Sequence, residues 1–191
     1  MRSVRRRIGI AVVLCSSFMF AQGSLELSAG KEKQAGRLYT AYNVWIENPA
    51  KVWSTNYKKG YILPAGTEIK KVKHNRKVVQ FTVVETGVEV TIVFVAKHHP
   101  GLSSAEIRER LVTDKNFDVL TSGFSEQELE AIENGEYEVG MSKEAVLVSL
   151  GYPPEIQTPS TKHDRWKYWA HRFNTFDVRF DDDGRVEAVV E

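Results

Sequence analysis

Cysteine is scarce in this chain: one, Cys15, stands among 191 residues. It lies in an N-terminal apolar stretch that we expect to be removed, so the mature chain would have no disulfide and no thiol nucleophile. That stretch, residues 8–20, is also shorter than the roughly 20 apolar residues of a membrane-spanning helix. These shortages exclude a disulfide scaffold and cysteine catalysis, and they argue against a membrane span in this stretch.

Catalytic motifs are missing as well. The sequence contains no Gly-x-Ser-x-Gly elbow, no phosphate-binding glycine loop and no His-Glu-x-x-His pair. His98 and His99 are neighbours that would point to opposite faces of a strand, so we interpret them as a solvated strand end, not a metal site. Asp181 to Gly184 fits a hairpin turn better than a calcium loop, whose twelfth position would be Val190. We expect no enzyme activity, no cofactor and no metal; a hydrolase that uses aspartates or histidines is the weakest of three hypotheses.

The N-terminus has the three-part layout of a secretory signal. Four arginines in residues 2–7 precede the apolar run, and Ala21-Gln22-Gly23 supplies small residues for cleavage before Ser24. We therefore predict a signal peptide over residues 1–23 and export to the periplasm or to the periplasmic face of the outer membrane. Two alternatives stay open: an uncleaved anchor, and lipidation at Cys15, which the preceding Leu14 disfavours.

The N-terminal half of the mature chain is rich in strand formers. Residues 24–36 are small, polar and charged, as in a flexible tether. Over residues 37–100, short runs of β-branched and aromatic residues cover 38–46, 51–57, 67–73, 78–84 and 88–95. Turn signals separate them, among them Asn48-Pro49, residues 63–66 and the polar residues 74–77. The alternation predicts a small β-barrel, similar in pattern to an SH3-like barrel.

Helix signals begin after residue 100. Residues 101–124 are expected to hold one helix, from Ser103 or Ser104 to about Val112, and then a linker. In residues 125–191, Ser125 and Glu128 form a capping box, and Ser142 is the N-cap of a second helix. Three strands follow at residues 165–171, 173–180 and 185–190. The pattern predicts two helices packed on a three-stranded antiparallel sheet and an α+β fold for the whole chain.

The last third of the chain resembles a known family. The segments that carry the resemblance are GMSKEAVLVSLGYP at residues 140–153, RWKYW at 165–169 and FDVRFDDDGRV at 176–186. They are similar to the BamE/SmpA-like (SmpA/OmlA) family of small bacterial outer-membrane proteins. The resemblance implies two helices on a three-stranded antiparallel sheet over residues 125–191, and a role in outer-membrane assembly or integrity.

Trp169 is the residue that we single out on this sheet. Strand alternation places Trp166 and Tyr168 under the helices and Trp169 on the opposite face. We predict that this face binds a protein partner through Trp169 and the polar side chains around it, which are Arg165, Lys167, His171, Asp177 and Arg179. In the alternative, lysine and arginine stems or the N-terminal domain cover the ring.

A second candidate surface is basic. Its predicted members are Lys58, Lys59, Lys70, Lys71, Lys73, Arg76 and Lys77. Such a patch attracts anionic lipid, lipopolysaccharide or an acidic partner. In the alternative, the lysines protect a sheet edge from aggregation. Residues 126–138 hold six glutamates and no basic residue, and would balance the basic domain or pack beside it.

Two functions therefore compete. The first is a non-catalytic bacterial envelope protein that binds other envelope proteins. The second is a module for a cell-wall glycan or peptide, since the N-terminal domain is rich in aromatic residues that stack on sugars, namely Tyr39, Tyr42, Trp45, Trp53, Tyr57 and Tyr61. An aromatic groove in the barrel would favour the second function, and a flat exposed aromatic patch on the C-terminal sheet would favour the first. We do not expect nucleic acid as a partner.

Overall fold

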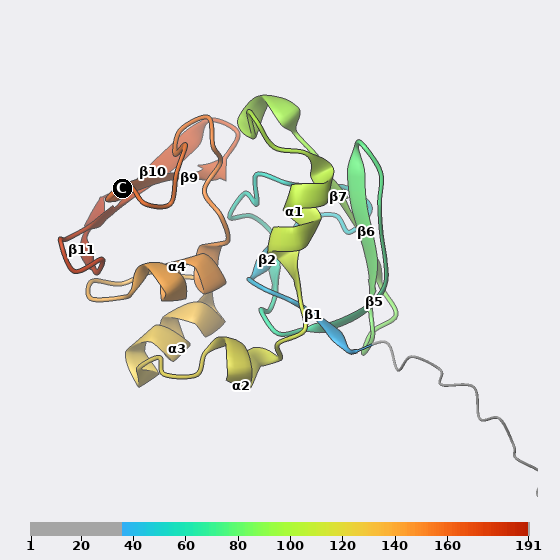
Figure 1. Cartoon of the computed structure of the whole chain (residues 1–191), viewed down its shortest axis with the longest axis horizontal. Coiled ribbons are helices and arrows are strands. Elements are labelled where there is room, and N and C mark those ends of the chain that lie inside the picture. Colours follow the sequence, from blue (N-terminus) through green and yellow to red (C-terminus); the bar gives the residue numbers. More distant parts are fainter. Residues whose placement is uncertain (1–35, 191) are drawn as a thin grey trace, which may run out of the picture. The chain divides into compact units, whose positions relative to one another are not determined.

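The computed structural model describes residues 36–190 (Figure 1). The expected signal peptide, Cys15 and all of the expected tether except Gly36 lie outside the described residues. Ala35–Glu191 forms one compact unit. Its fold is α+β, as the sequence predicts.

Three sheets make up the β-structure. The largest has six strands in the order β3-β7-β6-β5-β1-β8 and curls into a half-barrel. It is mixed, because β3 runs parallel to β7 while the other pairs are antiparallel. Its strands are β1 (Leu38–Thr40), β3 (Val52–Trp53), β5 (Glu68–His74), β6 (Val78–Val83), β7 (Glu89–Val93) and β8 (Val112–Thr113). The smaller sheets are β2 (Val44–Ile46) with β4 (Tyr61–Leu63), and the antiparallel β9 (Arg165–His171), β10 (Asn174–Phe180) and β11 (Val186–Val190).

The half-barrel encloses the first hydrophobic core. Alternate residues of β6 and β7, such as Val79, Phe81 and Val90, are buried, as the period of two in a strand requires. Helix α1 (Ser104–Leu111) adds Ile107 and Leu111 to this core, and Ser103 and Glu106 form its capping box. The expected helix after residue 100 is therefore confirmed.

The second core lies between two helices and the three-stranded sheet. Helices α3 (Glu126–Asn134) and α4 (Lys143–Leu150) begin after Ser125 and Ser142, as predicted. In Figure 1 they lie beside β9, β10 and β11. The expected inner face is confirmed for Trp166 and Tyr168, which are buried against these helices. Gly135 ends α3 at φ 64°, where a side chain would also collide with the ring of Trp45.

The prediction of one strand over residues 38–46 is wrong. The chain leaves the six-stranded sheet after Thr40 and enters the small sheet at Val44. Buried Asn43 fixes the turn between them: its Nδ2 donates to the Ile132 carbonyl at 2.6 Å, and its Oδ1 accepts from the Ala65 amide at 2.8 Å. A buried amide keeps such a position only when both of its ends are bonded.

The strand expected over residues 51–57 stops at Trp53. Asn56 adopts a left-handed φ of 51°, which asparagine tolerates better than most residues. Its Nδ2 donates to the carbonyls of Asn43 and Leu150, both at 2.9 Å, and its Oδ1 accepts from the Trp45 amide. Together, Asn43 and Asn56 form an asparagine hub that joins the half-barrel to α3 and α4.

Three further elements were not predicted. Residues 114–124, expected to be a linker, contain the short helix α2 (Phe117–Leu120), and β8 just before it pairs with β1. Residues 61–63, the last of which was expected in a turn, form β4. Phe117 packs against the second core. The segment between the halves thus contains a short helix and follows a short strand.

Candidate functional site

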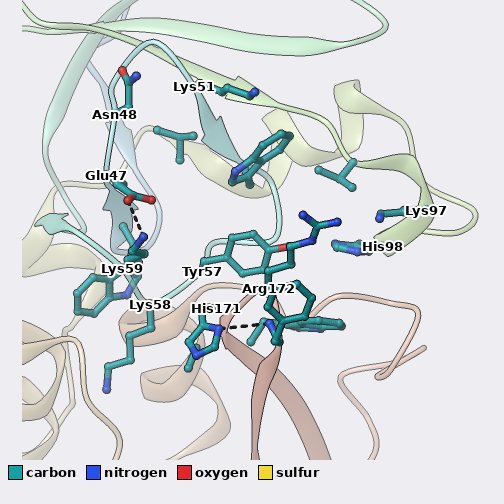
Figure 2. A pocket seen from close by; sticks show the side chains of 17 residues that line it. Glu47, Asn48, Lys51, Tyr57, Lys58, Lys59, Lys97, His98, His171 and Arg172 are labelled. Carbon is teal, nitrogen blue, oxygen red and sulfur yellow. Dashed lines mark hydrogen bonds and ion pairs between the residues drawn. The ribbon is translucent and has the colours of Figure 1, made fainter.

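A cleft of about 1060 Å³ lies between the half-barrel and the C-terminal sheet. One side is built from the segment around β2 and β3 and from the 3₁₀ helix η1 (Ala96–His98). The other is built from the end of β9 and the turn between β9 and β10. Figure 2 shows Glu47, Lys51 and Lys59 from the first segment facing the same space as His171 and Arg172. Its volume is slightly above the range of roughly 300–1,000 Å³ that is typical of ligand pockets.

Aromatic rings form much of the lining. They come from both halves of the chain and are Trp45, Trp53, Tyr57, Trp169 and Phe173. Trp53 is 38% exposed and Phe173 is 83% exposed, so both offer ring surface to solvent. Flat faces of this kind stack on sugar rings, bases or the side chains of a partner. An aromatic groove is therefore present, but both halves contribute to it, whereas the groove expected for a glycan-binding module lay within the N-terminal barrel.

The cleft is strongly basic. Four lysines and one arginine line it, against the single carboxylate of Glu47 among the described residues. Two of the cations are neutralised: Lys59 pairs with Glu47 at 2.6 Å, and Lys58 pairs with Glu136. Lys51, Lys97 and Arg172 have no ion pair with the part of the chain that the structure describes.

Three of these cations lie near aromatic faces. Lys51 Nζ is 4.7 Å from the ring centre of Trp53, and Arg172 Cζ is 5.2 Å from that of Phe173. Lys58 Nζ is 6.0 Å from the ring centre of Trp45. Cation–π contacts hold such side chains in place without neutralising their charge. The site thus places a cation near each of three of its aromatic rings.

Trp169 does not lie on an open face. Its ring stacks on His98 with centroids 5.3 Å apart and meets Tyr57 edge-on at 6.4 Å. The Lys58 amide also donates to the Trp169 carbonyl, at 3.4 Å. The alternative in which the N-terminal half covers this ring is therefore the arrangement observed, and Trp169 forms part of the cleft wall.

The two adjacent histidines are buried, so their interpretation as a solvated strand end is wrong. They belong to η1 and its C-cap and face different surroundings. His98 Nδ1 is 3.0 Å from Thr55 Oγ1; burial, with the nearby Lys97 and His99, lowers the pKa of His98. The imidazole is therefore neutral near pH 7, where it supports Trp169 by stacking.

His99 takes part in a separate ion-pair cluster. Its Nδ1 lies 2.7 Å from Glu155 Oε2, and Arg110 from α1 binds the other oxygen. Burial alone would raise the pKa of Glu155, but the hydrogen bonds from His99 and Arg110 outweigh it and lower the pKa. Arg110 also lies over the ring of Tyr152, 4.5 Å from its centre. This cluster ties η1 and α1 to the segment after α4.

The other residues predicted on the C-terminal sheet divide into two groups. Arg165, Lys167 and Asp177 come together as ion pairs, and Lys167 Nζ lies 3.2 Å from Asp177 Oδ1. Burial alone would raise the pKa of Asp177, yet hydrogen bonds from the two cations lower it. Arg179 is exposed and does not line the cleft, whereas His171 does.

The predicted basic patch also divides. Lys58 and Lys59 line the cleft. The other five lie exposed on β5 and the hairpin that follows it: Lys70, Lys71, Lys73, Arg76 and Lys77. The acidic segment at residues 126–138 contacts the basic half through the Lys58–Glu136 pair. Lys97 and Arg172 were missed, since no local pattern links η1 to a turn more than seventy residues later.

Comparisons with protein-family models, with curated proteins and with solved structures find no match for this chain. Within residues 36–190, no group of three or more histidine, cysteine or acidic side chains is placed to hold a metal ion. None of the helices described is both long and apolar enough to cross a membrane.

Proposed function

We propose that this chain is a non-catalytic, exported binding protein whose cleft takes a cell-wall glycan. The observation that carries the proposal is the set of five aromatic rings from both halves along one cleft. Sugar rings present flat C–H faces that stack on tryptophan and tyrosine. Glycosidases of the common type need two carboxylates across the bond, and Glu47, the carboxylate of the cleft among the described residues, is paired with Lys59.

Stacking can be tested with matched aromatic variants. Trp53→Ala and Tyr57→Ala remove rings from the cleft, whereas Tyr61→Ala removes a ring that is 52% exposed but does not line it. In affinity electrophoresis through gels that contain soluble cell-wall glycans, we expect the wild type and Tyr61→Ala to be retarded. The two cleft variants should migrate faster, with affinity reduced about tenfold or more per ring. Equal migration of all four proteins would reject the proposal.

A protein partner is the second candidate, and Phe173 favours it. This ring is 83% exposed at a turn, beside Arg172. Exposed aromatic and arginine side chains are common anchors of protein interfaces. If the ligand is an envelope protein, Phe173→Ala should abolish capture of that protein while glycan gels show no retardation of the wild type.

The location and family of the chain are part of the same proposal. Export is supported by the basic start, apolar run and small residues of the N-terminal sequence, and sequencing the mature N-terminus tests it; the expected first residue is Ser24. For the SH3-like and BamE/SmpA-like assignments, the support is the curled sheet of the first half and the order α3, α4, β9, β10, β11 in the last third. Loss of outer-membrane integrity in a deletion strain would support the family assignment.

A further inference from the structure

We infer that the glycan bound in this cleft is anionic, with carboxylate or phosphate groups on its sugars. This inference rests on the proposed function and adds the charge of the ligand to it. It starts from the difference between the cations of the cleft. Lys58 and Lys59 have carboxylate partners, whereas Lys51, Lys97 and Arg172 have none among the described residues.

The three uncompensated cations come from separate segments. Lys51 precedes β3, Lys97 lies in η1, and Arg172 lies in the turn between β9 and β10 (Figure 2). Bringing like charges to one concave surface costs electrostatic free energy, and an anionic ligand relieves that cost. A cleft with walls of low dielectric also focuses the positive potential and raises the local concentration of anions.

The spacing of rings and charges suits a sugar acid. Lys51 lies over Trp53 and Arg172 over Phe173, so a ring and a cation occur side by side at two places in the cleft. A sugar that stacks on the free part of a ring would place its substituents beside the neighbouring cation. Arginine binds carboxylate and phosphate with two parallel hydrogen bonds, and lysine binds them as a point charge.

Single-stranded nucleic acid offers similar chemistry, because its bases stack and its phosphates are charged. We favour the glycan, since export, as proposed, takes the chain away from nucleic acids. An oligonucleotide therefore enters the test as a competing ligand.

The test is calorimetric titration of the mature chain with four ligands. Tetragalacturonate carries carboxylates, a phosphorylated maltotetraose carries phosphate, maltotetraose is neutral, and a short oligothymidylate represents nucleic acid. The variants are Lys97→Ala and Arg172→Ala. Lys70→Ala and Lys73→Ala are the matched controls, because these lysines are exposed on β5 away from the cleft lining. Circular dichroism confirms that each variant is folded.

We expect one or both anionic glycans to bind more tightly than maltotetraose, with an affinity that falls as salt is added. Lys97→Ala and Arg172→Ala should each weaken that binding about tenfold, whereas the two control variants should bind as tightly as the wild type. If only one of the two anionic glycans binds, its charged group, carboxylate or phosphate, is the group that the cleft recognises. Equal binding of the neutral and anionic glycans would overturn the inference and leave the proposed function standing. Absence of any glycan binding would overturn both, and tighter binding of the oligonucleotide would overturn the assignment to a glycan.

Discussion

The two halves of the described chain are stabilised in different ways. The C-terminal half supplies its own helix caps: Glu128 accepts hydrogen bonds from Ser125 and Ser142, and so links the starts of α3 and α4. The N-terminal half does not complete its own turns. The hub residues Asn43 and Asn56 donate to carbonyls of α3 and α4. The first half therefore depends on the second for its local geometry. The N-caps of the second half are internal to it, although the first half satisfies carbonyls near the ends of α3 and α4.

We expect the largest loss of stability from a substitution in the second core. Trp166 is fully buried against Phe180, with ring centroids 4.6 Å apart, whereas Trp169 is only half-buried between the halves. We expect Trp166→Ala to lower the free energy of unfolding by about 3–5 kcal/mol, and Trp169→Ala by about 1–2 kcal/mol. Urea unfolding followed by circular dichroism measures both. If Trp169→Ala proves the more damaging, the contact between the halves contributes more than the second core.

We expect the second-largest loss of stability from a substitution in the asparagine hub. Asn43→Ala leaves the buried Ala65 amide without its partner. It also removes one of two donors to the Ile132 carbonyl, which still accepts from the Gly135 amide. The expected loss is about 2–4 kcal/mol of unfolding free energy. Asn48→Ala is the control, because this asparagine is exposed and bonds only its own turn, through the Ala50 amide. A loss no larger than that of the control would mean that the first half does not depend on the second in this way.

The contribution of Glu128 to the stability of the C-terminal half should depend on pH. Burial alone would raise its pKa, but hydrogen bonds from Ser125 and Ser142 lower it below the unfolded value. Its contribution is therefore complete above the unfolded pKa and is lost as pH falls through the folded pKa. We expect Glu128→Gln to cost about 1–2 kcal/mol at neutral pH. In thermal unfolding from about pH 7 to about pH 3, the difference between wild type and variant should shrink with acid. A constant difference would contradict this account.

The smallest effect should be that of Lys58→Ala. The Lys58–Glu136 pair connects the halves, yet the Glu136 side chain is 51% exposed and screened by water. We expect a loss below about 1 kcal/mol, reduced further by added salt. Chemical unfolding at low and high salt provides the measurement. A larger, salt-insensitive loss would show that this pair, and not only the asparagines, holds the halves together.

The difference between the halves also explains what could be predicted from the sequence. The capping box of Ser125 and Glu128 and the C-cap at Gly135 each involve residues close in sequence, so α3 was located correctly. Asn43 and Asn56 look like ordinary polar residues in strand-forming runs, because their partners are distant in the sequence. The cleft follows the same rule: the rings of Trp45, Trp53 and Tyr57 were expected to bind a ligand, but no local signal brings Trp169 to His98.

The asparagine hub also affects the order in which parts of the chain fold. The bond from Asn43 to Ile132 spans 89 residues, and the bond from Asn56 to Leu150 spans 94. Contacts between residues that are distant in the sequence form late, because closing the loop between them costs entropy before the contact can stabilise the chain. When the N-terminus of the chain emerges first, the turns around Asn43 and Asn56 lack these partners until α3 and α4 have also emerged. The cleft walls near Trp45 and Tyr57 would then be the last part of the N-terminal half to reach their final structure. If the chain is exported in an extended state, as proposed, it could not bind the proposed ligand until most of its length had crossed the membrane.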